Sequence, residues 1–186
     1  DGSYSWHCPG HSGGVAFLKS PVGQMFHQFF GENMLRADVC NSVDELGQLL
    51  DHTGPVAASE TNAARIFNAD HLFFVTNGTS TSNKIVWHSE VASDDVVLVD
   101  RNLGIIGPIP LQEFSRESIA GKIEANPLIK DKSVRPRVMT ITQSTYDGIL
   151  YNVEMIKAEL QDYVENLHFD EAWLPHATFH PIYHEM

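Results

Sequence analysis

A group of hydroxyl side chains follows the apolar run HLFF of residues 71–74. Residues 78–84 read GTSTSNK, and Thr79, Ser80 and Thr81 stand where a helix is predicted to begin. The first turn of a helix leaves backbone N–H groups without intrahelical partners, and nearby hydroxyl groups add further donors. Such a site suits a phosphate group. A nucleoside triphosphate is disfavoured because the glycine spacing of a Walker A loop is missing, and a capped helix that binds nothing is the alternative.

A carboxylate, Asp170 in HFDEAW, stands at the end of another apolar run. A charged group in that position is costly unless a cation or a hydrogen-bond donor faces it. The protonated pyridine nitrogen of pyridoxal phosphate is one such partner, since the carboxylate keeps the ring protonated and able to withdraw electrons. A capping aspartate or a structural ion pair is the alternative.

Three histidines near the end of the sequence offer a different chemistry. His176, His180 and His184 recur every four residues. On one helix this spacing would place three imidazoles on one face, which would suit zinc. Pro181 argues against a continuous helix there, so surface or core histidines are the alternative.

Cys8, in WHCPGH, is a candidate nucleophile because it lies between His7 and His11. The sequence identifies no Asn or Asp to orient a histidine, and a thiol reacts only when its pKa is lowered. Cys8 and Cys40 could form one disulfide. Their spacing is not typical of a stapled secreted scaffold, however, so reduced thiols are expected.

The elements that must position these side chains follow an alternating pattern. Apolar runs separated by amphipathic helices predict an α/β fold with a mainly parallel sheet and helices on both faces, whose ligands bind at the carboxyl ends of the strands. No crossover helix is predicted directly after Asp100, where one is expected. The predicted strands are 71–78, 94–100, 136–144 and 166–172, and the predicted helices are 20–31, 42–54, 54–68, 79–92, 115–126 and 152–163.

Composition limits the classes of partner. The 186 residues include 24 acidic and 12 basic side chains, a net charge of −12, so nucleic acid and anionic membrane surfaces are disfavoured as partners. No apolar run approaches the length of a membrane span, and the first residues do not resemble a signal peptide. A cytoplasmic protein whose partners are not polyanions is therefore expected.

Several longer motifs together resemble one family. PGHSGG, FFVTNGTSTSNK, TITQSTYDGILYN and LHFDEAWLPHATFH are similar to segments of the bacterial pyridoxal-phosphate-dependent ornithine/lysine/arginine decarboxylases. The resemblance covers essentially the whole chain and implies the aspartate-aminotransferase-like fold, fold type I. It implies that residues 1–53 are an N-terminal loop and helical segment and that residues 54–186 are an incomplete cofactor-binding large domain.

The resemblance also assigns roles to residues. It implies that the hydroxyls of GTSTSNK hold the cofactor phosphate and that Asp170 pairs with the pyridine nitrogen and is catalytic. It also implies that Trp173 lines the cofactor pocket and that Thr142 and Ser144 approach the ring hydroxyl or the substrate. The implied cofactor-binding residues are Thr79, Ser80, Thr81, Thr142, Ser144, Asp170 and Trp173, with no metal.

The implied activity is decarboxylation of arginine to agmatine. DEAWLPHATFH looks like the arginine-specific members, and the proton consumed in each turnover suits acid resistance. The family implies a homodimer that assembles into a larger homo-oligomer, a decamer. Lysine or ornithine decarboxylation, a histidine-rich metal-binding or interaction module and a non-catalytic paralogue are the alternatives.

Two departures from the family pattern stand out. RN at 101–102 runs straight into LGIIGP, whereas family members carry a CHKS-type segment there, with a histidine that stacks on the cofactor ring, followed by a helix and a strand. The sequence also stops before the family lysine that binds the cofactor covalently. A segment is therefore expected to be missing between 102 and 103, both ends look cut, and the chain is expected to be a partial, cofactor-free form.

Overall fold

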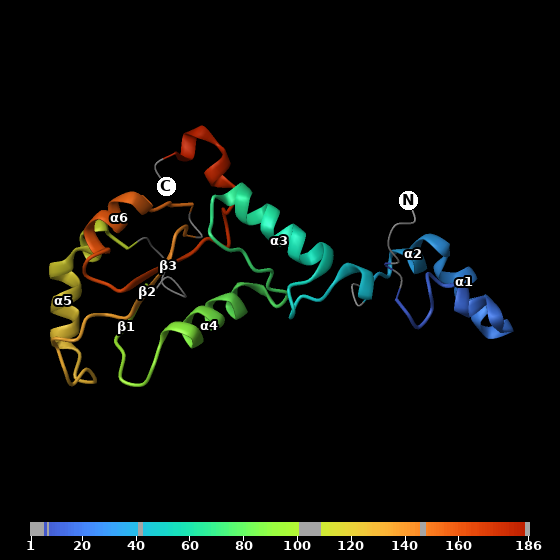
Figure 1. The fold of residues 1–186 in the computed structure, drawn as a ribbon, viewed down its shortest axis with the longest axis horizontal. Helices are drawn as coiled ribbons and strands as arrows, with labels where there is room; N and C mark the ends of the chain where they lie inside the picture. Colours follow the sequence, from blue (N-terminus) through green and yellow to red (C-terminus); the bar gives the residue numbers. More distant parts are fainter. Residues whose placement is uncertain (1–5, 7, 41–42, 101–108, 146–147, 185–186) are drawn as a thin grey trace. The chain divides into compact units, whose positions relative to one another are not determined.

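A small parallel sheet organises the second half of the chain. The computed structural model describes residues 6, 8–40, 43–100, 109–145 and 148–184. These fall into two units, residues 1–74 and residues 75–186 (Figure 1). The sheet belongs to the second unit, and its strands run β1 (Val97–Val99), β2 (Val138–Thr142) and β3 (Asn166–Asp170) in that spatial order, all parallel.

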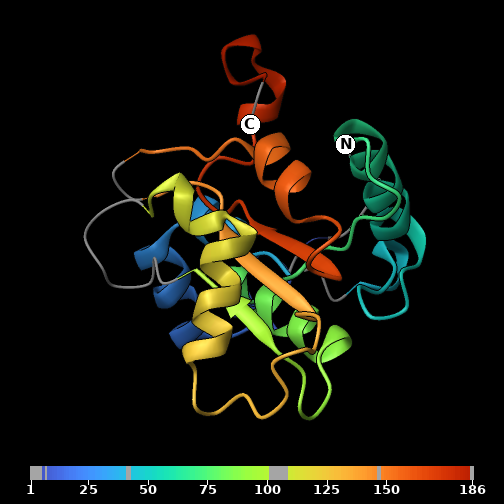
Figure 2. The same cartoon turned by 90° about the vertical axis from the view of Figure 1, so that its left-hand side faces the viewer.

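Helices cover both faces of this sheet. α4 (Gly78–Glu90) precedes β1, α5 (Arg116–Ala125) lies between β1 and β2, and α6 (Val153–Leu160) lies between β2 and β3. Figure 2 shows α5 in front of the strands and α4 behind them. The expected α/β architecture with a parallel sheet is confirmed for the described residues, and α5 supplies the crossover from β1 to β2.

The core of the second unit lies between the sheet and the helices α5 and α6. Met139 and Ile141 are two positions apart on β2, so the alternation of side chains along a strand places both on the same side. They pack against buried residues that include Ile119 and Ile123 of α5 and Ile156 of α6. Thr140 and Thr142 occupy the other side of β2, which faces α4, so the polar side of the strand is left for a site.

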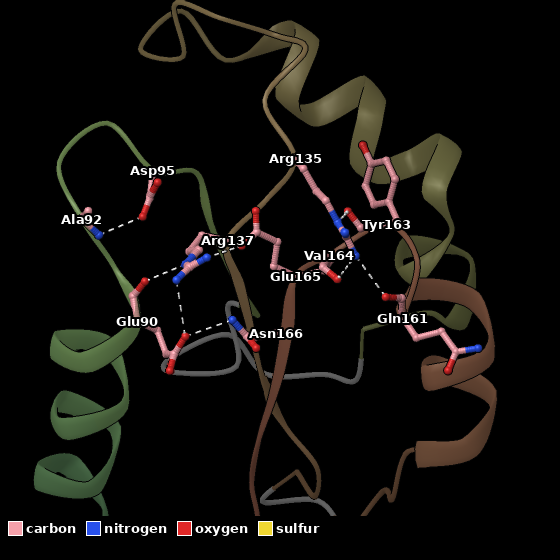
Figure 3. Close-up of polar contacts among 10 residues, drawn as sticks. All are labelled: Glu90, Ala92, Asp95, Arg135, Arg137, Gln161, Tyr163, Val164, Glu165 and Asn166. Atoms are coloured by element: carbon pink, nitrogen blue, oxygen red, sulfur yellow. Dashed lines mark hydrogen bonds and ion pairs between the residues drawn. The ribbon is translucent and has the colours of Figure 1, made fainter.

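An arginine anchors α4 at the amino ends of the strands (Figure 3). Arg137 donates through Nε to the carbonyl of Glu90 at 2.8 Å, and its guanidinium also pairs with the carboxylate of Glu165. The neighbouring Arg135 donates to the carbonyls of Gln161 at 3.2 Å and Val164 at 2.8 Å, just after α6. These bonds satisfy carbonyls that have no partner at helix ends.

The first unit consists of short helices. They are η1 (Val15–Lys19), α1 (Pro21–Phe30), α2 (Glu32–Ala37), η2 (Asp44–Leu46) and α3 (Gly54–Phe67). Ser20 caps α1 by accepting the N–H of Gly23, and Asn68 ends α3 in the left-handed conformation. The helices predicted at 20–31 and 54–68 are therefore confirmed.

Two predicted elements are wrong. The helix predicted at 42–54 is only the single turn η2, because Gly47 has φ 76° and approaches Thr53 so closely that a Cβ would lie 1.9 Å from the Thr53 carbonyl oxygen. The strand predicted at 71–78 forms no ladder among the described residues. The N–H of Phe74 donates instead to the carboxylate of Glu60 at 2.9 Å.

Candidate functional site

A cavity opens at the carboxyl ends of the three strands. Its volume is about 370 Å³, and side chains from α4, from all three strands and from the segments after β2 and β3 line it. Small-molecule sites in proteins have volumes of this order, and open α/β sheets bind ligands at this edge. The lining residues are Thr79, Ser80, Asn83, Trp87, Val99, Asp100, Thr140, Thr142, Ser144, Thr145, Asp170, Ala172 and Trp173.

The first turn of α4 lines part of the cavity. Asn77 precedes the helix and makes no side-chain cap hydrogen bond, and Gly78 has φ 74°, a left-handed conformation that suits glycine. The Asn77 side chain therefore does not cap the helix, which keeps N–H groups of the first turn available to an anion. Thr79 and Ser80 line the cavity here. Thr81 is not among its lining residues.

Asp170, at the last position of β3, also lines the cavity. Its two carboxylate oxygens accept different donors: Oδ2 takes the Asn83 amide at 2.9 Å and Oδ1 takes the N–H of Ala172 at 3.1 Å. Both donors are neutral, so the negative charge is held in place without being cancelled. The described ion pairs do not include Asp170, and a carboxylate that lines a cavity without a cationic partner suits a ligand cation.

A second carboxylate, Asp100, lines the cavity beyond β1. It is buried and accepts both the N–H of Thr142 at 2.7 Å and the Thr142 hydroxyl at 3.1 Å. Burial raises the pKa of Asp100 above its ordinary value, although the two Thr142 donors oppose the shift. The Thr142 hydroxyl is thus already engaged by protein.

Ser144 supplies an unused hydroxyl. It is 1% exposed, and its Oγ is the one buried side-chain polar atom among the described residues that lacks a hydrogen-bond partner. Backbone pairing holds it in place, because Ser144 pairs with Leu150 and the N–H of Tyr151 donates to the carbonyl of Gln143. A buried hydroxyl without a partner is costly, so a ligand in the cavity is the natural partner.

Three side chains, of which Trp87 and Thr140 line the cavity, form a chain of hydrogen bonds. Trp87 donates through Nε1 to the Thr140 hydroxyl at 2.8 Å, and that oxygen lies 3.2 Å from Nδ1 of His168. The Thr140 hydroxyl proton is free to face Nδ1, which leaves the ring proton of neutral His168 on Nε2. Burial lowers the pKa of His168, which favours this neutral form.

Sequence reasoning missed part of the lining. Asn83, Trp87, Asp100 and Thr140 were not singled out, although Thr79, Asn83 and Trp87 recur every four residues and so share one face of α4. This spacing of four residues is the sequence signal that could have identified Asn83 and Trp87. Asp100 and Thr140 enter the site only through strand pairing.

The three C-terminal histidines do not share a helix face. The segment forms two single turns, η4 (Ala177–Phe179) and η5 (Pro181–Tyr183), and His180 between them is extended with φ −119° and ψ 129°. Proline at 181 causes this break, because it cannot continue a helix. The helical zinc arrangement considered for His176, His180 and His184 is therefore wrong.

In the first unit, Cys8, His11 and Asp38 lie within 4.8 Å of one another. Asp38 is the acidic neighbour that the sequence did not identify. Nδ1 of His11 accepts the N–H of Gly14 at 3.1 Å, so Nε2 carries the ring proton and donates to Asp38 at 2.9 Å. Both nitrogens are engaged, and in this arrangement neither can deprotonate Cys8 or bind a metal ion. Cys8 and Cys40 are not joined to each other by a disulfide.

The second unit therefore defines a class of protein. It is an α/β protein whose sheet edge carries an uncapped helix start and a carboxylate in one cavity, which suits a ligand with an anionic group and a cationic group. Within the described residues, no helix is long and apolar enough to cross a membrane.

The chain belongs to the Orn/Lys/Arg decarboxylase family. The family model described as "Orn/Lys/Arg decarboxylase, major domain" matches residues 1–103 and 102–186. Lysine decarboxylase LdcA of Pseudomonas aeruginosa is 57% identical over 206 aligned residues, which cover 97% of this chain and 27% of LdcA. The solved structure of that enzyme matches with a TM-score of 0.78 over the same shares of the two chains.

Two Escherichia coli relatives extend the comparison. The constitutive lysine decarboxylase is 46% identical over 97% of this chain and 28% of its own length, and its solved structure matches with a TM-score of 0.74. The biodegradative arginine decarboxylase is 41% identical over 97% of this chain and 27% of its own length. The chain thus spans about a quarter of the length of these relatives, and the lysine decarboxylases resemble it more than this arginine decarboxylase does.

Proposed function

We propose that the protein to which this chain belongs is a pyridoxal-phosphate-dependent lysine decarboxylase and that the chain forms part of its cofactor-binding domain. The order of similarity, from 57% to a lysine decarboxylase down to 41% to an arginine decarboxylase, favours lysine over the arginine expected from DEAWLPHATFH. The observation that carries the proposal is the single cavity that joins Thr79 and Ser80 to Asp170.

The residues present fit this cofactor. The uncapped start of α4 with Thr79 and Ser80 would hold the phosphate, and Asp170 would face the ring nitrogen. Ser144 has a buried hydroxyl without a partner in the same cavity, which a polar group of the cofactor or substrate would satisfy. Trp173 would line the ring. Thr81 is left out of this set because it does not line the cavity.

Thr142 takes a different role in this proposal. Its hydroxyl and its N–H both donate to Asp100, so it would hold that carboxylate rather than contact the ring hydroxyl. When bound, pyridoxal phosphate supplies a ring that accepts the electron pair released as the bond to the carboxylate breaks. Asp170 would hold a proton on the ring nitrogen, and Trp87 and Trp173 would exclude water from the cavity.

The test is the substrate preference of the full-length protein. We expect it to release cadaverine from lysine with a kcat/KM about 100-fold above that for agmatine formation from arginine, since a site built for one cationic group pairs poorly with another. Product analysis by chromatography measures both rates. A higher rate with arginine would overturn the lysine assignment. Cofactor binding without decarboxylation of lysine, arginine or ornithine would favour a non-catalytic paralogue.

Asp170→Asn provides the matched variant for this test. Asparagine keeps the shape of the side chain and removes its charge, so we expect kcat/KM for lysine to fall about 10²–10³-fold. Turnover close to that of the unaltered enzyme would remove Asp170 from the proposed chemistry.

We also propose that the chain lacks a family segment between residues 102 and 103. The family match comes in two parts that meet at these residues, and the 206-residue alignment to LdcA is longer than the 186-residue chain. The junction lies outside the described residues. Peptide mapping of the full-length protein tests this proposal, because a tryptic peptide that joins Asn102 directly to Leu103 would confirm the junction.

A further inference from the structure

One face of α4 is tied to the sheet by two side chains a single turn apart. Asn83 bonds to Asp170 on β3, and Trp87 bonds to Thr140 on β2. The Asn83 bond is 2.9 Å long, is partly buried and joins residues 87 positions apart in the sequence. Asn83 and Asp170 both line the cavity.

The Asn83 bond controls the direction of the Asp170 carboxylate. With the Ala172 N–H on Oδ1 and the Asn83 amide on Oδ2, donors from two different elements oppose rotation of the group. Each oxygen accepts two hydrogen bonds, so both keep a site for a ligand cation. An amide suits this task, because a lysine or arginine in its place would compete for the charge that the ligand needs.

We propose that Asn83 is a positioning residue that aims the Asp170 carboxylate at the ring nitrogen of the cofactor. This inference rests on the proposed function and deepens it. The helix that presents Thr79 and Ser80 to the phosphate then also sets the direction of the acid at the other end of the ring. One helix thereby fixes the relative placement of both ends of the ligand.

A purely structural role for Asn83 makes a different prediction. Trp87 ties α4 to the sheet independently, and alanine is a better helix former than asparagine, so Asn83→Ala leaves the helix formed and anchored. A positioning role through Asp170 affects only ligands that carry a ring nitrogen. A structural role affects every ligand of the cavity alike.

The experiment compares two ligands in the full-length protein. One is pyridoxal phosphate, and the other is its analogue with C–H in place of the ring nitrogen. Quenching of tryptophan fluorescence reports both dissociation constants, since Trp87 and Trp173 line the cavity. For Asn83→Ala we expect about a tenfold weaker affinity for pyridoxal phosphate and less than about a twofold change for the analogue.

Two controls complete the design. Ser89→Ala changes an exposed residue of α4 whose hydroxyl donates to the carbonyl of Val86, and it should alter neither constant. In an Asp170→Ala background, Asn83→Ala should have no further effect on pyridoxal phosphate binding, because the two residues act as one unit.

Equal losses for both ligands, or no loss for either, would overturn the positioning role while leaving the proposed function intact. Failure of the unaltered protein to bind pyridoxal phosphate would overturn the proposed function and this inference together.

Discussion

At the scale of single residues, the site depends on polar side chains that satisfy one another across the sheet. Thr142 donates its N–H and its hydroxyl to Asp100. Asp170 accepts the Asn83 amide and the Ala172 N–H. Among the buried side-chain polar atoms described, only Ser144 Oγ has no hydrogen-bond partner. Groups with partners are held in place by protein, and the unpartnered hydroxyl marks where a ligand atom belongs.

His168 gives stability a pH dependence. Burial lowers its pKa in the folded chain, so below its ordinary value of about 6.5 the unfolded chain binds a proton that the folded chain does not. The stability associated with neutral His168 is therefore present above that pH and is lost as the pH falls toward the lowered folded-state pKa.

We expect His168→Asn to remove this dependence, because its side-chain oxygen can take the place of Nδ1 beside Thr140 without titrating. The difference in urea midpoint between the unaltered full-length protein and the variant should shrink between pH 7.5 and pH 5.5. A difference that stays constant over that range would contradict the role given to His168.

At the scale of elements, both ends of a helix are secured by side chains. The Asn152 side chain accepts the N–H of Met155 at 2.9 Å and caps α6, and Arg135 binds carbonyls just after its last turn. α6 carries Ile156, which is 2% exposed, and Leu160, which is fully buried. Its capping therefore bears on the core as well as on the helix.

Asn152→Ala should lower the free energy of unfolding by about 1 kcal/mol, the usual cost of losing an N-cap. Urea denaturation of the full-length protein measures the change. Asn152→Ser is the matched control, because serine also caps and should cost only a few tenths of that amount. Equal losses in the two variants would show that the cap is not responsible.

At the scale of the whole molecule, the two units differ in how much they bury. In the second unit a contiguous core surrounds Met139 and Ile141. In the first, Leu35, Leu46 and Ala64 are the buried apolar residues described, and Val22, Met25 and Phe29 are at least 70% exposed. The site lies on the unit that has its own core. β2 contributes to both the core and the site, because one side of the strand packs into the core and the other side faces the cavity.

Ile141→Ala should cost about 2–5 kcal/mol, since the residue is fully buried and its removal leaves a cavity in the core. Leu128→Ala is the control, because Leu128 is 85% exposed and its loss should change stability by less than about 0.5 kcal/mol. Thermal unfolding of the full-length protein distinguishes the two. Similar effects for both variants would contradict the assignment of Ile141 to the core.

The sequence by itself determined the order of elements from α4 to β3, because helix caps, periodicity and apolar runs are local signals. The resemblance of its motifs to the decarboxylase family assigned residues 79–81 and 170 to one site. It did not determine the segments at 42–54 and 71–78, whose local patterns were overridden by the close approach of Gly47 to Thr53 and by the bond from Phe74 to Glu60.

Only the tertiary structure decided which side chains meet in the cavity. It brought in Asn83, Asp100 and Thr140 and left out Thr81. The physical reason is sequence distance: the bonds from Asn83 to Asp170 and from Thr142 to Asp100 span 87 and 42 residues, and no local pattern encodes such pairs. Strand register and the packing of α4 against the sheet create them.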